Sequence, residues 1–70
     1  MTDIDALEER IGDSGLKIGY IIEKLGLSRQ GFNNKMTGKT EFTISEVATL
    51  CDILGITSLK EKERIFFAAK

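Results

Sequence analysis

Residues 28–39, SRQGFNNKMTGK, combine amide, guanidinium, hydroxyl and ammonium side chains around only two large apolar residues, Phe32 and Met36. On a helix these two residues share one face, and the polar side chains occupy the rest of the surface. Arginine can donate two hydrogen bonds to guanine, and asparagine or glutamine can pair in a similar way with adenine. The candidate base-reading residues are therefore Arg29, Gln30, Asn33, Asn34 and Thr37.

Lysine and hydroxyl side chains around this stretch are candidates for contacts with nucleic-acid phosphates. They are Lys17, Lys24, Lys35, Lys39 and Thr40. Tyr20 fits two roles equally well, a phosphate contact or a partly buried packing residue. An ordinary solvated helix face is the alternative interpretation of the whole stretch, but such a face more often uses Glu, Lys and Ala, which are better helix formers.

The charge distribution favours a local basic face, although the net charge of the whole chain is −1. Residues 14–40 hold five bases against the single acid Glu23, a net charge of +4. Residues 1–13 have a net charge of −4, and residues 41–70 have a net charge of −1. A chance cluster of solvated lysines is the alternative explanation of the charge alone. The positive segment nevertheless coincides with the candidate base-reading residues, which is typical of a nucleic-acid interface.

The composition limits the class of protein. A chain of 70 residues is expected to form one domain. It has one cysteine and no histidine, which excludes an intrachain disulfide and argues against a zinc site. No signal peptide and no membrane-spanning run is recognised, so we expect a cytoplasmic protein without cofactor or metal. No nucleophile–base pair and no phosphate-binding glycine loop is present, so we expect no enzyme activity.

Apolar residues recur at helical spacing, and the chain has no proline, which predicts an all-α domain of five helices. The first helix is expected from about residue 3 to residue 11 or 12, and the second from about residue 18 to residue 25. A third is expected between the N-cap Ser28 and Gly38. A fourth is expected between Thr43 and Gly55, and a fifth from Ser58 onward. Capping boxes are predicted for Thr43 with Glu46 and for Ser58 with Glu61.

The predicted core follows the apolar stripes of these helices. It comprises Ile4, Leu7, Ile11, Ile18, Ile21, Ile22, Leu25, Phe32, Met36, Val47, Leu50, Cys51 and Leu54, and the fifth helix carries the apolar residues Leu59, Ile65 and Phe66. Cys51 belongs to such a stripe and is expected to be a buried structural residue. The tight Leu25-Gly26-Leu27 turn between the second and third helices predicts a steep angle between them, as in a helix-turn-helix motif over about residues 17–37.

The segments LKIGYIIEKLGLSRQGFNNKMTGK and FTISEVATLCDILGI together resemble the lambda-repressor-like helix-turn-helix family of phage repressors, Cro proteins and XRE-type bacterial regulators. The likeness covers about residues 4–66. It implies a five-helix domain whose third helix enters the DNA major groove, with Arg29, Gln30, Asn33 and Thr37 facing bases and Asn34 close by. Ser28, Lys17 and Lys39 would then lie near the DNA backbone.

Two positions depart from the family pattern. Family members usually have a small residue where this chain has Ile22, and our hypothesis is that Gly31 supplies the missing space between the second and third helices. The first residue of the second helix is often a polar DNA contact in the family, whereas here it is Ile18. We therefore do not expect Ile18 to make the DNA contact that the family makes from this position.

The five apolar residues 65–69, IFFAA, cannot all face one core. We expect part of this run to pack on the first and fourth helices and part to form a dimer contact through Ile65, Phe66 and Phe67, with intramolecular packing as the alternative. The expected function is that of a sequence-specific transcriptional regulator that binds a pseudo-palindromic double-stranded operator as a homodimer, without a small-molecule ligand. The alternative is a protein-interaction module of the same fold, such as an adaptor or antitoxin-like subunit.

Overall fold

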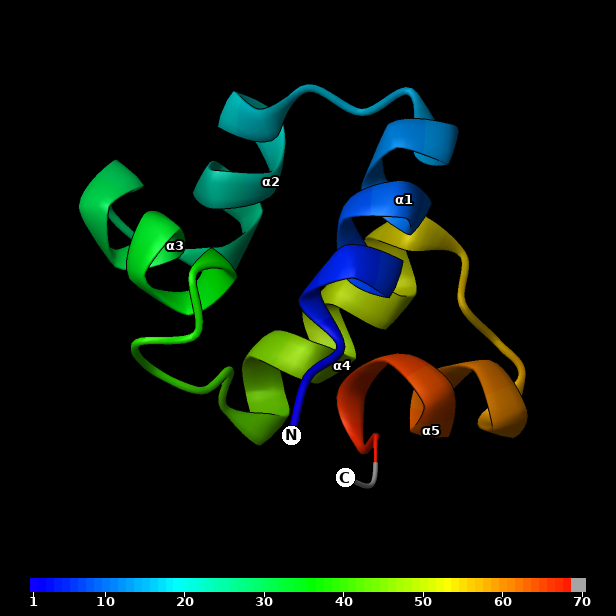
Figure 1. Ribbon diagram of the computed structural model, residues 1–70. Coiled ribbons are helices and arrows are strands. Elements are labelled where there is room, and N and C mark those ends of the chain that lie inside the picture. The colour runs from blue at the N-terminus through cyan, green and yellow to red at the C-terminus, as the bar shows by residue number, and fades with distance from the viewer. Residues whose placement is uncertain (69–70) are drawn as a thin grey trace.

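The computed structural model of the protein describes residues 1–68. It shows five α-helices joined by short connections (Figure 1). The helices are α1 (Ile4–Ser14), α2 (Ile18–Leu25), α3 (Arg29–Met36), α4 (Ile44–Leu54) and α5 (Leu59–Phe66). Within this described part of the chain there is no β-strand. The predicted all-α class is thus confirmed, and the bounds of α2 agree with the prediction.

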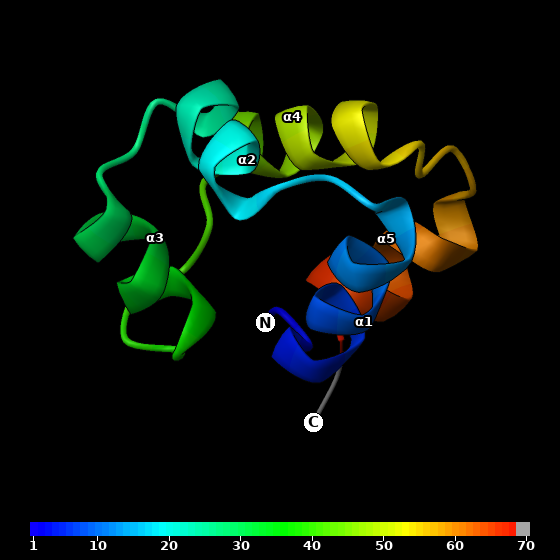
Figure 2. The ribbon, with the colours of Figure 1, turned by 90° about the horizontal axis from the view of Figure 1, so that it is seen from above.

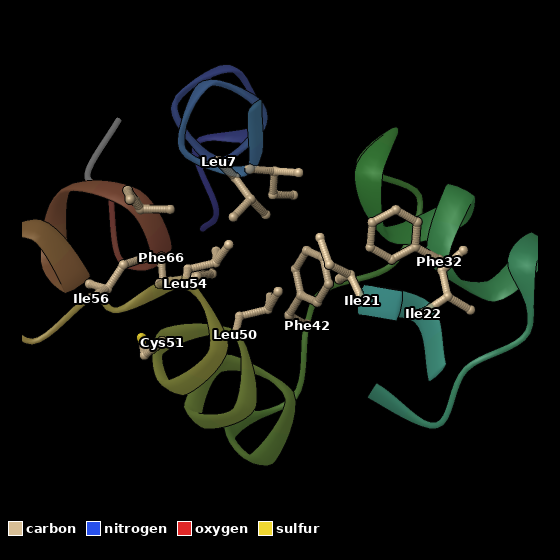
Figure 3. Close-up of a cluster of buried hydrophobic side chains, with 12 residues drawn as sticks. Leu7, Ile21, Ile22, Phe32, Phe42, Leu50, Cys51, Leu54, Ile56 and Phe66 are labelled. Atoms are coloured by element: carbon tan, nitrogen blue, oxygen red, sulfur yellow. The ribbon is translucent and has the colours of Figure 1, made fainter. Parts of the chain in front are cut away.

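The helix α4 is the packing partner of both α1 and α2, and α1 also packs against α5. Figures 1 and 2 show α3 at one edge of the molecule, beside α2 and far from α5. The core between these helices contains twelve buried residues (Figure 3), namely Leu7, Ile11, Ile21, Ile22, Phe32, Phe42, Leu50, Cys51, Leu54, Ile56, Ile65 and Phe66. Burial of Cys51 confirms its predicted structural role.

Helix α1 extends beyond its predicted end. Asp3 caps its first turn by accepting a hydrogen bond from the Ala6 amide at 3.1 Å. The helix then continues through Gly12 to Ser14 and ends at Gly15, whose φ of 74° is left-handed. The Ser14 hydroxyl donates to the Ile11 carbonyl at 2.6 Å and so satisfies one of the free carbonyl groups at the end of the helix.

The two ends of the described chain are held together by backbone hydrogen bonds. The Asp3 amide donates to the Ile65 carbonyl at 2.6 Å, and the Ala68 amide donates to the Met1 carbonyl at 2.9 Å. The start of α1 is therefore fixed against the end of α5 (Figure 2).

The capping box predicted for α5 is only half formed. The Ser58 hydroxyl accepts from the Glu61 amide at 3.3 Å, as predicted. The Glu61 carboxylate does not return a bond to Ser58, because it pairs with Arg10 Nε of α1 at 3.0 Å. In contrast, the box predicted for α4 is complete: the Thr43 hydroxyl and the Glu46 carboxylate bond to each other's backbone amide.

One predicted core position was wrong, because Ile18 is 39% exposed. Leu59, an apolar residue of the fifth helix, is 70% exposed. Both residues stand at the first position of their helices. Among residues 1–68, no helix has the length and apolar character needed to cross a membrane.

The predicted dimer contact must be corrected for two of its three residues. Ile65 is fully buried and Phe66 is 3% exposed, so both side chains belong to the core of the monomer and offer no surface to a partner. Phe67, just past the end of α5, is 61% exposed. Ala69, the last residue of the apolar run, lies outside the described residues.

Candidate nucleic-acid interface

The turn between α2 and α3 is held by backbone hydrogen bonds around a left-handed glycine. Gly26 has a φ of 70°, which L-residues with a side chain rarely adopt, and its amide donates to the Glu23 carbonyl at 3.1 Å. The next amide, of Leu27, donates back to the Ile22 carbonyl at 3.2 Å. This C-terminal cap of α2 ends the helix sharply and sets the direction in which α3 leaves.

Helix α3 begins with a side-chain cap and is attached to the core by few apolar contacts. The Ser28 hydroxyl accepts from the Gly31 amide at 3.0 Å. Phe32 is 3% exposed and belongs to the core (Figure 3). The half-buried Leu27 and Met36 pack against the same core. The apolar attachment of α3 therefore leaves Arg29, Gln30 and Asn33 exposed.

The hypothesis that Gly31 makes space for Ile22 was wrong. A methyl group added at Gly31 would lie 3.2 Å from Ser28 Oγ and 4.0 Å from Leu27 Cδ2, with no atom of Ile22 within 4 Å. A Cβ at this position would crowd the hydroxyl that caps α3. Glycine at position 31 therefore leaves room for the capping hydroxyl of Ser28 at the start of α3. It is not required for a close approach between α2 and α3.

Four of the five candidate base-reading residues are exposed on α3 or at its end, namely Arg29, Gln30, Asn33 and Thr37. The fifth, Asn34, is half-buried, and its side-chain oxygen accepts from Gln30 Nε2 at 3.0 Å. The Thr37 hydroxyl donates to the Asn33 carbonyl at 2.9 Å, so its hydrogen is already engaged and its oxygen stays available as an acceptor.

The connection after α3 is folded back onto the end of that helix. The Asn34 carbonyl accepts from the Lys39 amide at 2.9 Å and from the Thr40 amide at 3.3 Å. Gly38 has a φ of 82° and provides the left-handed residue that this loop requires. Lys39 and Thr40 are consequently exposed directly beyond the C-terminal end of α3, as two of the predicted phosphate contacts.

Lys35 is not placed as a phosphate contact, because its ammonium group turns toward α4. Lys35 Nζ lies 2.9 Å from Glu46 Oε1 and donates to the Glu41 carbonyl at 2.9 Å. It also lies 5.8 Å from the centre of the Phe42 ring. The two charged side chains are only 13% and 14% exposed, so the pair is shielded from solvent. The prediction for Lys35 is corrected to a structural role that holds α3 to the start of α4.

The other predicted phosphate contacts are exposed. They are Lys17, Tyr20 and Lys24 of the α2 region, Ser28 at the start of α3, and Lys39 and Thr40 after it. Tyr20 is 42% exposed, and Lys24 Nζ lies 5.6 Å from the centre of its ring. Lys17, Tyr20 and Lys24 follow helical spacing and so stand along one side of α2.

Sequence reasoning missed Glu46 as an organiser of this site. The capping-box pattern identified its bond to Thr43 but gave no indication that a base from α3 would reach the same carboxylate. Burial of the Glu46 carboxyl acts to raise its pKa, but the hydrogen bonds from Thr43 and the charge of Lys35 outweigh this effect and leave the pKa below its usual value.

Residues 1–68 hold no group of three or more acidic or cysteine side chains arranged to bind a metal ion. Cys51 has a raised pKa because burial disfavours its thiolate. Comparisons of the chain with protein-family models, with curated proteins and with solved structures gave no match.

Proposed function

We propose that the protein is a sequence-specific DNA-binding transcriptional regulator of the phage-repressor or Cro type, with α2 and α3 as its helix-turn-helix. The observation that carries the proposal is the division of α3 into two faces. Phe32 and Met36 attach the helix to the core, whereas Arg29, Gln30 and Asn33 are exposed and of the types that pair with base edges.

The position of α3 supports its insertion into DNA. It lies at one edge of the molecule, and the other helices lie to one side of it (Figure 2). An α-helix with side chains is about 10–12 Å wide, which matches the roughly 12 Å width of the major groove. Arg29 and Gln30 occupy the first turn of α3, and in helix-turn-helix proteins this end of the second helix contacts bases.

The electrostatics of this edge support phosphate contacts at both ends of α3. The described residues form two ion pairs, Arg10 with Glu61 and Lys35 with Glu46. Lys17, Arg29 and Lys39 take part in neither pair and are exposed. Their charges are available to replace counterions on DNA phosphates, so binding should weaken steeply as salt concentration rises.

A homodimer is part of this proposal, because two copies on a pseudo-palindromic operator would read two half-sites. Phe67 is the residue that we propose for the centre of the dimer contact. It is 61% exposed and lines a shallow groove with Lys60, Glu63 and Arg64 of α5. The two signs of charge around Phe67 allow acid–base pairs to form across a two-fold axis.

The same surface favours one alternative function. A protein-interaction module, such as an adaptor or antitoxin-like subunit, would use the exposed Phe67 and Leu59 of the α5 region to bind a different protein. In that case α3 would show no preference among DNA sequences.

Selection from a library of randomised DNA duplexes tests the proposed function. At low salt, we expect enrichment of a related set of sequences with two similar half-sites. Fluorescence titration of an enriched duplex should then show affinity that falls steeply with added salt. Recovery of unrelated sequences after repeated rounds would reject sequence-specific binding and favour the interaction module.

A further inference from the structure

An apolar groove of about 530 Å³ lies between α1 and α3 and was not anticipated from the sequence. Its apolar lining comes from three parts of the chain, namely Ile11 of α1, Leu16 and Ile18 before and at the start of α2, and Phe32 with Met36 of α3. Ile18 is 39% exposed, and Leu16 and Met36 are half-buried, so the groove presents side-chain carbon to solvent.

The α1 side of this groove is acidic. Glu8 lines the groove, and Asp5 lies one turn before it on the same side of the helix. Within the described chain, neither carboxylate belongs to an ion pair. The base of α1, Arg10, pairs with Glu61 of α5 and is thereby held away from the groove. Two cations stand beside lining residues, Lys17 at the loop end of the groove and Arg29 one turn before Asn33 on α3, so the acidic flank is confined to α1.

We propose that this groove docks a basic amphipathic helix from another protein. An apolar groove between helices accepts residues at i, i+3, i+4 and i+7 of such a helix. The carboxylates of Glu8 and Asp5 favour lysine or arginine, and disfavour glutamate or aspartate, on the flank of the docked helix that faces α1. A docked helix of about 12 residues is about 18 Å long, which fits within the 20–28 Å dimensions of the domain.

Occupation of the groove has a consequence for DNA binding, and this consequence alone rests on the function proposed above. Asn33, a candidate base-reading residue, also lines the groove. A helix docked there covers part of the surface that α3 would present to the major groove. The partner and DNA should therefore compete for the protein.

The docking is tested without DNA, by nuclear magnetic resonance of isotope-labelled protein. The probes are two synthetic amphipathic peptides of about 15 residues, one of leucine and lysine and one with glutamate in place of every lysine. We expect the basic peptide to shift the amide signals of Gly12, Gly15 and Ile18 in a saturable manner. The acidic peptide should leave these signals unchanged.

Two matched pairs of variants locate the contact. Glu8→Lys and Asp13→Lys change the net charge equally, but Asp13 lies on α1 outside the groove lining. We expect about fivefold weaker binding of the basic peptide for Glu8→Lys and little change for Asp13→Lys. Ile18→Ser should weaken binding about tenfold, whereas Ile44→Ser, at a residue that is 87% exposed elsewhere, should not.

Three results would overturn the proposal. The first is equal binding of both peptides, and the second is equal weakening by Glu8→Lys and Asp13→Lys. The third is a shift of the groove signals with protein concentration alone, which would assign the groove to a second copy of this chain. If the peptide docks but does not displace an enriched duplex, the proposed docking is retained and only the proposed competition with DNA is rejected. If no duplex is enriched at all, the DNA-binding function fails instead.

Discussion

Lys35 and Glu46 join α3 to the first turn of α4 through one carboxylate oxygen. Glu46 Oε1 lies 2.9 Å from Lys35 Nζ and also accepts the Thr43 amide at 2.9 Å. The ion pair and the N-terminal cap of α4 therefore share an acceptor. Because α3 has few apolar attachments, this polar contact helps to fix the direction of the helix relative to the rest of the core.

Replacing Glu46 with glutamine should separate the two roles of this carboxylate. Glutamine can still accept the Thr43 amide in a capping box, but it removes the charge that pairs with Lys35. We expect a loss of about 1 kcal/mol in the free energy of unfolding, which lowers the melting temperature of a domain of this size by roughly 4–8 °C. Thermal unfolding followed by circular dichroism measures this change.

The matched control is Glu9→Gln, since Glu9 is exposed and takes no part in the two ion pairs of the described chain. A surface substitution of this kind should change the stability by less than about 0.5 kcal/mol. Equal melting temperatures for the two variants would show that the Lys35–Glu46 pair contributes nothing to the fold.

The same carboxylate predicts a pH dependence. Burial acts to raise the pKa of Glu46, but the bonds from Thr43 and Lys35 bring it below the usual value of 4.5. A carboxyl with a lowered pKa in the folded state stabilises the protein above its unfolded pKa and loses this effect as the pH falls through the folded pKa. The difference in stability between wild type and Glu46→Gln should be constant near neutral pH and shrink below about pH 4.5. Urea unfolding at a series of pH values measures it, and a difference that persists unchanged to about pH 3 would contradict the assignment.

Two glycine-to-alanine substitutions should have different effects on stability. At Gly19 of α2 an added methyl group meets nothing within 4 Å, so alanine should stabilise the protein by about 0.5–1 kcal/mol. At Gly31 the methyl group would lie 3.2 Å from Ser28 Oγ, and the conflict with this cap should cancel or reverse the gain. Chemical denaturation compares the two, and equal stabilisation would show that Ser28 does not limit the residue at position 31.

Phe67→Glu tests the proposed dimer contact. Phe67 is 61% exposed, so a charge there should leave the monomer folded but disfavour burial against a second copy. The mass in solution, measured by sedimentation or light scattering, should be that of a dimer for wild type and of a monomer for Phe67→Glu. Ile44→Glu provides the control, because Ile44 is 87% exposed and does not line the groove around Phe67, and this variant should remain dimeric. A monomeric wild type, or an unchanged Phe67→Glu dimer, would exclude this contact.

Local sequence signals predicted most of the helices because each helix carries its own start and stop residues. Thr43, Glu46 and Gly55 cap α4 through bonds that span only a few residues, so their pattern can be recognised without knowledge of the fold. The end of α1 was misplaced because Gly12 is tolerated inside a helix when the next glycine, Gly15, provides the left-handed cap.

The errors in the site came from contacts between distant residues. A lysine on a polar helix can turn toward solvent or toward the protein, and only the position of Glu46 in space decides the direction of Lys35. The carboxylate of Glu61 likewise bonds to Arg10, which is 51 residues away, and not to the nearby Ser58 amide that the capping-box pattern predicted. Which members of the run Ile65–Phe67 face the core depends on where α5 ends, and the spacing of apolar residues alone did not reveal this.

Asn33→Ala and Lys39→Ala should separate base recognition from phosphate binding if α3 reads DNA. Asn33 is exposed on the helix, and loss of one two-bond base contact should reduce discrimination at one position by about 1–3 kcal/mol. Lys39 follows the helix, and its loss should weaken binding to all duplexes similarly and lower the salt slope by about 1. Fluorescence titrations of both variants against an enriched duplex and its single-base changes, at several salt concentrations, measure these effects. Uniform weakening by Asn33→Ala, with every base preference retained, would exclude Asn33 as a reader and shift the assignment to Arg29 and Gln30.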